Sequence, residues 1–305
     1  MLLSQKRRDA CSPELNQNAN NPRKPIIALI LSLCPGLGQQ YAGHLYRGII
    51  LYSAIIMVCW LSAIAFMYIK SKHTSLIILF VPIVFVLFVM VDAMCCAMTK
   101  RNTYCLKWYN KPWIYFAVFA LLMVTVNPLM DLLIGHHIIR AYLVTTESME
   151  PTILLHDLVV INKLKQPRRN DIVLIGYDDG QIDGLMTNII KDQTLRRIVA
   201  MPGDKVEVRG QLVYVNNTKL FEPYVKAGND VYTNYYTNED YRWGPGTVPD
   251  NAYFVLSDAR EFSFDSRMMG FVSKERINGV ANKVFWSWNM DDGRIKWERT
   301  AMSLD

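Results

Sequence analysis

The sequence predicts an α-helical transmembrane region followed by a mostly β extracytoplasmic domain. Of the 305 residues, 51% are hydrophobic and 20% are charged, which is a more apolar composition than soluble domains usually have. Long apolar runs lie before residue 135, whereas short or alternating apolar runs separated by turn residues begin at about residue 141. All six cysteines lie in the first 105 residues, so the predicted β domain is free of thiols and tolerates an oxidising compartment.

Charge divides the chain in a similar way. Residues 1–111 contain 12 Lys or Arg and 3 Asp or Glu, a net charge of +9, whereas residues 112–305 contain 21 and 24, a net charge of −3. The positive excess flanks apolar runs rather than covering the predicted folded domain, so it indicates membrane orientation and argues against a nucleic-acid partner. The cysteine spacing is not that of a zinc site, and we expect neither a metal ion nor a cofactor.

Residues 1–25 are predicted to form a polar cytoplasmic N-terminus, and residues 26–134 a membrane module. A transmembrane helix needs about 20 predominantly apolar residues. The segments of residues 48–69, 75–98 and 113–134 meet this requirement. The loop before the last of them is basic, so we expect it in the cytoplasm and everything after residue 134 on the outer face. The four basic residues of this loop are Lys100, Arg101, Lys107 and Lys111.

Residues 26–43 begin with an apolar run that is too short to span a membrane by itself. We expect an interfacial or re-entrant helix, or a short kinked span packed through its glycines. The stretch Pro35-Gly-Leu-Gly-Gln-Gln-Tyr-Ala-Gly43 resembles small two-helix membrane modules that occur alone or fused to other domains. That resemblance implies no chemistry.

Residues 141–305 are predicted to form the β domain, because no helical period of useful length occurs there. Two stretches, residues 177–193 and 227–249, are expected to be insertions or lids without regular structure. The expected strands cover residues 158–162, 172–175, 197–200, 206–208, 212–216, 253–256 and 280–288.

Five short motifs follow one another in this domain. They are Ser148-Met-Glu-Pro-Thr152, Asn170-Asp-Ile-Val173, Arg196-Arg-Ile-Val-Ala-Met-Pro-Gly-Asp204, Leu212-Val-Tyr-Val-Asn216 and Ser257-Asp-Ala-Arg-Glu-Phe-Ser-Phe-Asp-Ser-Arg267 with Gly270. Each motif alone is weak, but five in register are specific. Together, over roughly residues 143–285, they resemble the bacterial type I signal peptidase family.

A serine peptidase requires a hydroxyl nucleophile, a base that is neutral at working pH, and donors for the oxyanion. The domain has no histidine after His156, so its main body supplies no Ser–His pair, and a serine with a desolvated lysine is the remaining standard solution. The resemblance implies that Ser148 is the nucleophile. It also implies that the Thr146 hydroxyl supports an oxyanion hole beside the backbone N–H of Ser148.

The resemblance assigns supporting roles around this pair. Ser263 matches the serine that hydrogen-bonds the catalytic amine, Asp265 and Arg267 match a bracing pair, and Arg197 matches the family's own arginine. An ordinary surface salt bridge is the alternative for Asp265 and Arg267. Three positions depart from the family pattern: Ser257 replaces a glycine, Ala259 an asparagine and Met269 an aromatic residue.

The largest departure concerns the base. Counted back from Pro202-Gly-Asp204, the family's catalytic lysine falls on Arg196, whose guanidinium does not deprotonate in proteins. Lys191 and His156 are the candidate replacements. Lys191 lies five residues away, about 16 Å along a strand and on its opposite face, so it would need a bulge or a shifted strand. His156 could chemically serve as the base, but its place in the sequence is more typical of a solvent-exposed turn residue.

The expected function is therefore a membrane-bound serine endopeptidase of the signal peptidase I type, which removes signal peptides after small residues at the first and third positions before the cut. The alternative is a catalytically impaired relative that binds signal peptides or regulates secretion. A third class is a structural subunit of a secretion or conjugation apparatus. The expected partners are signal peptides, the lipid bilayer and secretion machinery. The expected location is the bacterial cytoplasmic (inner) membrane, with the β domain periplasmic.

Overall fold

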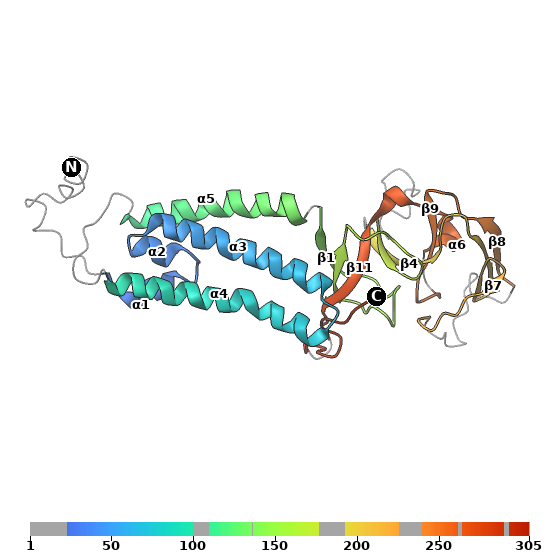
Figure 1. The fold of residues 1–305 in the computed structure, drawn as a ribbon. Coiled ribbons are helices and arrows are strands. Elements are labelled where there is room, and N and C mark those ends of the chain that lie inside the picture. The colour runs from blue at the N-terminus through green and yellow to red at the C-terminus, as the bar shows by residue number, and fades with distance from the viewer. Residues whose placement is uncertain are drawn as a thin grey trace, which may run out of the picture. The chain divides into compact units, whose positions relative to one another are not determined.

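A computed structural model of the chain describes residues 23–99, 110–135, 137–176, 193–225, 240–261, 264–289 and 293–304. The chain divides into two compact units, Met1–Gly135 and His136–Asp305. The first unit is helical and the second is built mainly of strands (Figure 1).

The helical unit contains three helices in its described part that are long and apolar enough to cross a membrane. They are α3 (Leu45–Tyr68), α4 (Lys72–Thr99) and α5 (Pro112–Met130), which continues into the π-helical turn η3 (Asp131–Gly135). These helices, followed by an antiparallel β unit, confirm the predicted fold class.

Residues 26–43 form two short helices, α1 (Pro25–Leu31) and α2 (Leu37–Tyr41). Glycines let these helices approach their neighbours closely. A Cβ at Gly36 would lie 2.4 Å from the carbonyl oxygen of Gly48, and one at Gly38 would lie 2.3 Å from that of Ala28. Only residues without a side chain fit such contacts.

Asp92 lies within the apolar α4 and has partners from two other helices. It forms an ion pair with Arg47 of α3, and Gln39 of α2 donates to it at 3.2 Å and to the Val89 carbonyl at 2.8 Å. A charge in an apolar helix is tolerated when it is paired in this way. These contacts fix α2 against α3 and α4.

The β unit contains a seven-stranded sheet and a four-stranded sheet, and neighbouring strands are antiparallel. The large sheet has the order β1-β2-β11-β3-β4-β9-β10, and the small one β7-β6-β5-β8. The large sheet comprises β1 (Ile139–Leu143), β2 (Leu158–Asn162), β3 (Ile172–Gly176), β4 (Gln193–Ala200), β9 (Ala252–Leu256), β10 (Val272–Ser273) and β11 (Ile277–Trp286). The small sheet comprises β5 (Lys205–Arg209), β6 (Leu212–Val215), β7 (Thr218–Lys219) and β8 (Arg242–Thr247), and the short helices of this unit are α6 (Ser266–Met269) and η4 (Lys274–Arg276).

The expectation that residues 227–249 lack regular structure is wrong at one end, because β8 pairs with β5 there. Its Gly244, Pro245 and Gly246 are typical of a turn, and the strand conformation depends on the hydrogen bonds of the partner strand. The strand β1 begins two residues before the expected start of the domain at residue 141.

Candidate active site

Ser148 lies in the segment that joins β1 to β2. Val144, Met149 and Ile153 of this segment are buried together in one apolar cluster. The carbonyl oxygen of Ser148 accepts a hydrogen bond of 3.1 Å from the N–H of Ala259. The residues on either side of Ser148 are therefore anchored in the apolar core, and a backbone hydrogen bond joins Ser148 to the loop that follows β9.

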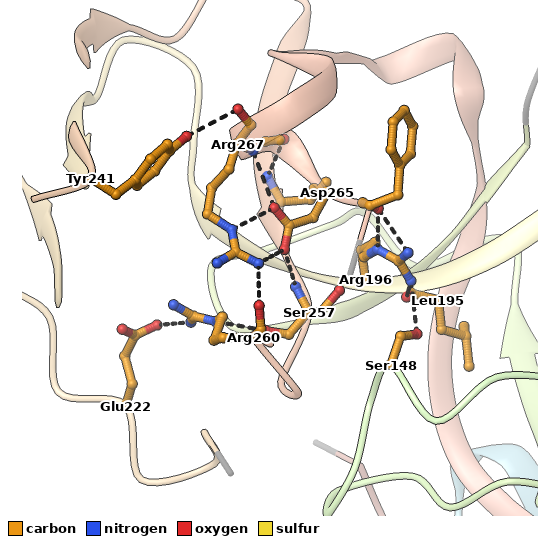
Figure 2. A network of polar contacts seen from close by, with 12 residues as sticks. Ser148, Leu195, Arg196, Glu222, Tyr241, Ser257, Arg260, Asp265 and Arg267 are labelled. Carbon is orange, nitrogen blue, oxygen red and sulfur yellow. Dashed lines mark hydrogen bonds and ion pairs between the residues drawn. The ribbon is translucent and has the colours of Figure 1, made fainter. Parts of the chain in front are cut away.

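Arg196 of β4 contacts the Ser148 hydroxyl (Figure 2). Its Nη1 donates to Ser148 Oγ at 2.9 Å and to Thr194 Oγ1 at 2.7 Å, and its Nε and Nη2 both donate to the Phe264 carbonyl oxygen, at 3.0 and 2.8 Å. Nη1 also donates to the Leu195 carbonyl oxygen at 2.6 Å. With 5% of its surface exposed, the Arg196 side chain is held as a buried cation beside the hydroxyl.

The direction of the hydrogen bond between Arg196 and Ser148 matters chemically. A guanidinium has donors and no acceptor, so Ser148 Oγ must accept and its own proton must point elsewhere. Thr146 Oγ1 lies 3.0 Å from Ser148 Oγ, and either hydroxyl can be the donor. With a neutral lysine the bond would run the other way, from the serine hydroxyl to the amine lone pair. Arg196 therefore reverses the polarity that a general base requires.

Arg197, the next residue of β4, makes a different set of contacts. It forms a two-pronged ion pair with the fully buried Asp258, with Nε–Oδ1 and Nη2–Oδ2 distances of 2.8 and 2.6 Å. Its Nη1 donates to the Asn170 carbonyl oxygen at 2.8 Å, and its guanidinium lies 4.0 Å from the centre of the Tyr224 ring. Thr152 joins the pair by donating to Asp258 Oδ2 at 2.6 Å.

Asp265 and Arg267 form a second buried pair (Figure 2). Arg267 donates to both carboxylate oxygens, at 2.9 and 2.8 Å, and to the Arg260 carbonyl oxygen at 2.8 Å. Asp265 also accepts from the N–H of Ser257 at 3.2 Å. These residues are buried, so the surface-salt-bridge alternative does not describe them, and they hold the loop after β9 in shape.

A third ion pair joins this loop to the segment after β7. Arg260 pairs with Glu222, and both side chains are less than a tenth exposed. The hydroxyl of Tyr224 donates to Glu222 at 3.1 Å, and the Tyr224 ring lies over Arg197. Burial raises the pKa of Tyr224, and the charge of Glu222 raises it further. Glu222 and Tyr224 could not be identified from the sequence, because only the fold brings them beside residues of the motifs.

Ser257, at a position where the resemblance implies a glycine, lies directly after β9. Its side chain is fully buried, and its Oγ has no hydrogen-bond partner among the described residues. Burying a hydroxyl without a partner is unfavourable.

The remaining sequence candidates are not brought to Ser148 in the described part of the chain. Lys191 and Ser263 lie outside the described residues. His156 occupies a left-handed turn with φ of 66°, and its N–H donates to the Val144 carbonyl oxygen at 2.9 Å. The side chains hydrogen-bonded to Ser148 Oγ among the described residues are those of Arg196 and Thr146.

Comparisons with known proteins show to which family the chain belongs. Residues 111–286 match the family model described as signal peptidase, peptidase S26. A probable signal peptidase I-2 of Synechocystis is 36% identical over 48% of this chain and 63% of its own length, which is just under two thirds of that relative. Signal peptidase I S of Bacillus subtilis is 32% identical over 54% of this chain and 87% of its own length. A solved signal peptidase I of Enterococcus faecalis is 28% identical, with a TM-score of 0.27, and covers 38% of this chain and 97% of its own. The family model matches more than half of the chain, which therefore belongs to the signal peptidase family, peptidase S26.

Proposed function

We propose that the protein is a membrane-bound serine endopeptidase that removes signal peptides from exported proteins, cutting after small residues at the first and third positions before the bond. Family membership supports the activity class. The observation that carries the proposal is the placement of Ser148 Oγ between Thr146 Oγ1 at 3.0 Å and Arg196 Nη1 at 2.9 Å. An accessible nucleophile held beside a second hydroxyl and a cation suits attack on a peptide carbonyl.

The three apolar helices support a location in the bacterial cytoplasmic (inner) membrane. The basic residues between the second and third of them indicate that this loop is cytoplasmic and that the β unit faces the periplasm. A signal peptide spans the same membrane, so its cleavage site would emerge on the side of the membrane that the β unit faces. Contacts with secretion machinery are part of this proposal.

The proposed reaction follows from the protonation states of the site. Ser148 Oγ attacks the carbonyl carbon, and the oxyanion is stabilised by the Thr146 hydroxyl and the Ser148 N–H. Because Arg196 does not accept a proton, the Ser148 proton passes to a solvent hydroxide ion, giving water. The C–N bond then breaks and the leaving amine takes a proton from water. A second water hydrolyses the acyl-enzyme ester, which releases the signal peptide with a C-terminal carboxylate and restores Ser148.

The role of Arg196 in this scheme is electrostatic. A positive charge beside a hydroxyl favours the alkoxide form of the serine. Turnover that depends on solvent hydroxide should be slow and should rise about tenfold with each pH unit, without the plateau that a lysine base produces.

The second candidate is a protein that binds signal peptides without cutting them, or regulates another peptidase. The same observation favours it, because Arg196 donates a hydrogen bond where a base would accept one. In this case the β unit and the membrane helices are retained for capture alone.

The deciding experiment uses the purified full-length chain in detergent with a preprotein, assayed from pH 7 to 10. Slow cleavage that rises with pH and disappears in Ser148→Ala supports the endopeptidase. Absence of cleavage across the whole range, together with peptide binding that Ser148→Ala retains, supports the binder and overturns the endopeptidase.

A further inference from the structure

The segment that carries Ser148 lies outside the regular strands. Residues 144–157 contain neither helix nor strand, so the hydrogen-bond ladders of the sheet do not fix them along their length. Thr152 of this segment is held at two atoms. Its hydroxyl donates to Asp258 Oδ2 at 2.6 Å, and its carbonyl oxygen accepts from Arg299 Nη2 at 2.9 Å. The second contact comes from near the C-terminal end of the chain.

This C-terminal segment lies along the second half of β11. The strand β3 pairs with the first half of β11. Further along, the Val284 carbonyl oxygen accepts from the Ala301 N–H at 2.8 Å. The Asn282 carbonyl oxygen accepts from the Leu304 N–H at 2.9 Å. The sheet therefore determines where Arg299 lies.

Arg299 joins two parts of the Ser148 segment through one nitrogen atom. Its Nη2 donates to the Thr152 carbonyl oxygen and, at 2.8 Å, to Asp157 Oδ2. The Asp157 carboxylate is fully buried, and it also accepts from the Leu154 N–H at 3.0 Å and from Ser287 Oγ at 2.5 Å. A buried carboxylate is costly without a cation, so Arg299 supports the fold of this segment as well as its place.

We propose that Arg299 is a positioning residue for Ser148. By holding the Thr152 carbonyl and the Asp157 carboxylate together, it keeps the Ser148 hydroxyl in its place beside Arg196. Arg299 lies beyond the part of the chain that matches the family model. The inference rests on the proposed function, because the exact place of the hydroxyl matters for attack on a peptide bond.

The expected effect on turnover follows from geometry. A displacement of a reacting group by about 1 Å can lower a rate by about a hundredfold. Arg299→Met removes both hydrogen bonds at similar side-chain length, so kcat for a preprotein at pH 9 should fall by about ten- to a hundredfold. KM should stay within about threefold, because Arg299 acts on the nucleophile and not on substrate binding. Arg299→Lys should stay within about threefold in kcat, since both bonds come from a single nitrogen and an ammonium group has three donors.

A second measurement does not depend on turnover. Amide hydrogen exchange of the full-length protein in detergent, followed by mass spectrometry, reports how firmly residues 148–157 are held. Exchange there should be at least tenfold faster in Arg299→Met than in the wild type, and unchanged in β5 and β6. The matched control is Arg169→Met, because Arg169 pairs with Asp204 at 2.6 Å, outside the Ser148 segment. This control should leave exchange at residues 148–157 and kcat within about threefold of the wild type.

The outcomes separate the inference from the proposed function. Unchanged exchange at residues 148–157 in Arg299→Met, or an unchanged kcat, would overturn the positioning role. Faster exchange throughout the β unit would also overturn it, because Arg299 would then serve only overall stability. Arg299→Gln keeps a polar side chain and should show the same local pattern, so poor folding of Arg299→Met leaves the inference open to disproof. A wild-type protein that cuts no preprotein would count against the proposed function, and exchange would still decide whether Arg299 holds the segment.

Discussion

Two adjacent arginines of β4 show how differently the same side chain is used on the two faces of one strand. Arg197 donates to the Asp258 carboxylate at 2.8 and 2.6 Å and stacks on Tyr224. Arg196 donates to hydroxyl and carbonyl oxygens, one of which is Ser148 Oγ. Successive residues of a strand point to opposite faces, so the two guanidinium groups occupy separate environments. Arg197 serves the structure, and the charge of Arg196 is presented to the site.

The loop after β9 is held by ion pairs of the same kind as that of Arg197. Arg260 and Arg267 each have a buried carboxylate partner, as Arg197 has. These pairs do not involve Arg196, which contacts the same loop through the Phe264 carbonyl oxygen.

The largest expected effect comes from placing an amine at position 196. Arg196→Lys should raise kcat/KM for a preprotein by about 10²- to 10⁴-fold, because a desolvated lysine can deprotonate and serve as general base. The measurement is steady-state cleavage at pH 8 with purified variants. The double variant Ser148→Ala with Arg196→Lys is the control and should be inactive. An unchanged rate in Arg196→Lys would show that the base is not what limits this site.

A change at the buried pair of Arg197 and Asp258 should instead lower the free energy of unfolding. Asp258→Ala leaves the buried Arg197 without its carboxylate, and breaking a buried pair in this way costs about 3 to 5 kcal/mol of unfolding free energy. Chemical denaturation followed by tryptophan fluorescence measures the loss. Arg209→Ala, which removes the exposed pair with Glu207, should leave the transition unchanged. A loss in Asp258→Ala no larger than that in Arg209→Ala would contradict the structural role of Arg197.

Much of the fold could be predicted because local patterns determined it. The strand β2 begins and ends where its short apolar run predicts, and the three long helices follow from apolar runs of sufficient length. The strand β8 could not be predicted, since its glycines and proline suggest a turn and only pairing with β5 makes it extended.

For the site, motif spacing indicated which residues to examine but not how they meet. The contact of Ser148 with Arg196 joins positions 48 residues apart, and its donor direction depends on the guanidinium. Glu222 and Arg260 are 38 residues apart, and no local pattern links them. Such contacts are set by strand order and packing, which spacing along the chain does not report.

A smaller effect on stability is expected from a change at Ser257, in the loop after β9. Its buried Oγ has no partner among the described residues, so Ser257→Ala should stabilise the protein by about 1 kcal/mol by removing an unsatisfied hydroxyl. The shift of the denaturation midpoint measures it. Ser266→Ala is the matched control, because its Oγ accepts from the Val255 N–H at 3.0 Å and its loss should destabilise. Destabilisation by Ser257→Ala would mean that the hydroxyl is used.

The smallest expected effect concerns Tyr224, which lies over Arg197, and the free energy of unfolding at alkaline pH. Burial and the charge of Glu222 raise the pKa of Tyr224, so above pH 10 the unfolded chain loses this proton while the folded chain keeps it. The stabilising contribution of neutral Tyr224 is therefore complete below about pH 10 and declines above it, by up to about 1.4 kcal/mol per pH unit. Tyr224→Phe should make the decline of unfolding free energy between pH 10 and 11 shallower than in the wild type, as measured by denaturant titration at each pH. Parallel pH profiles in the two proteins would show that Tyr224 titrates alike in the folded and the unfolded chain. Its ring would then not be buried over Arg197 in solution.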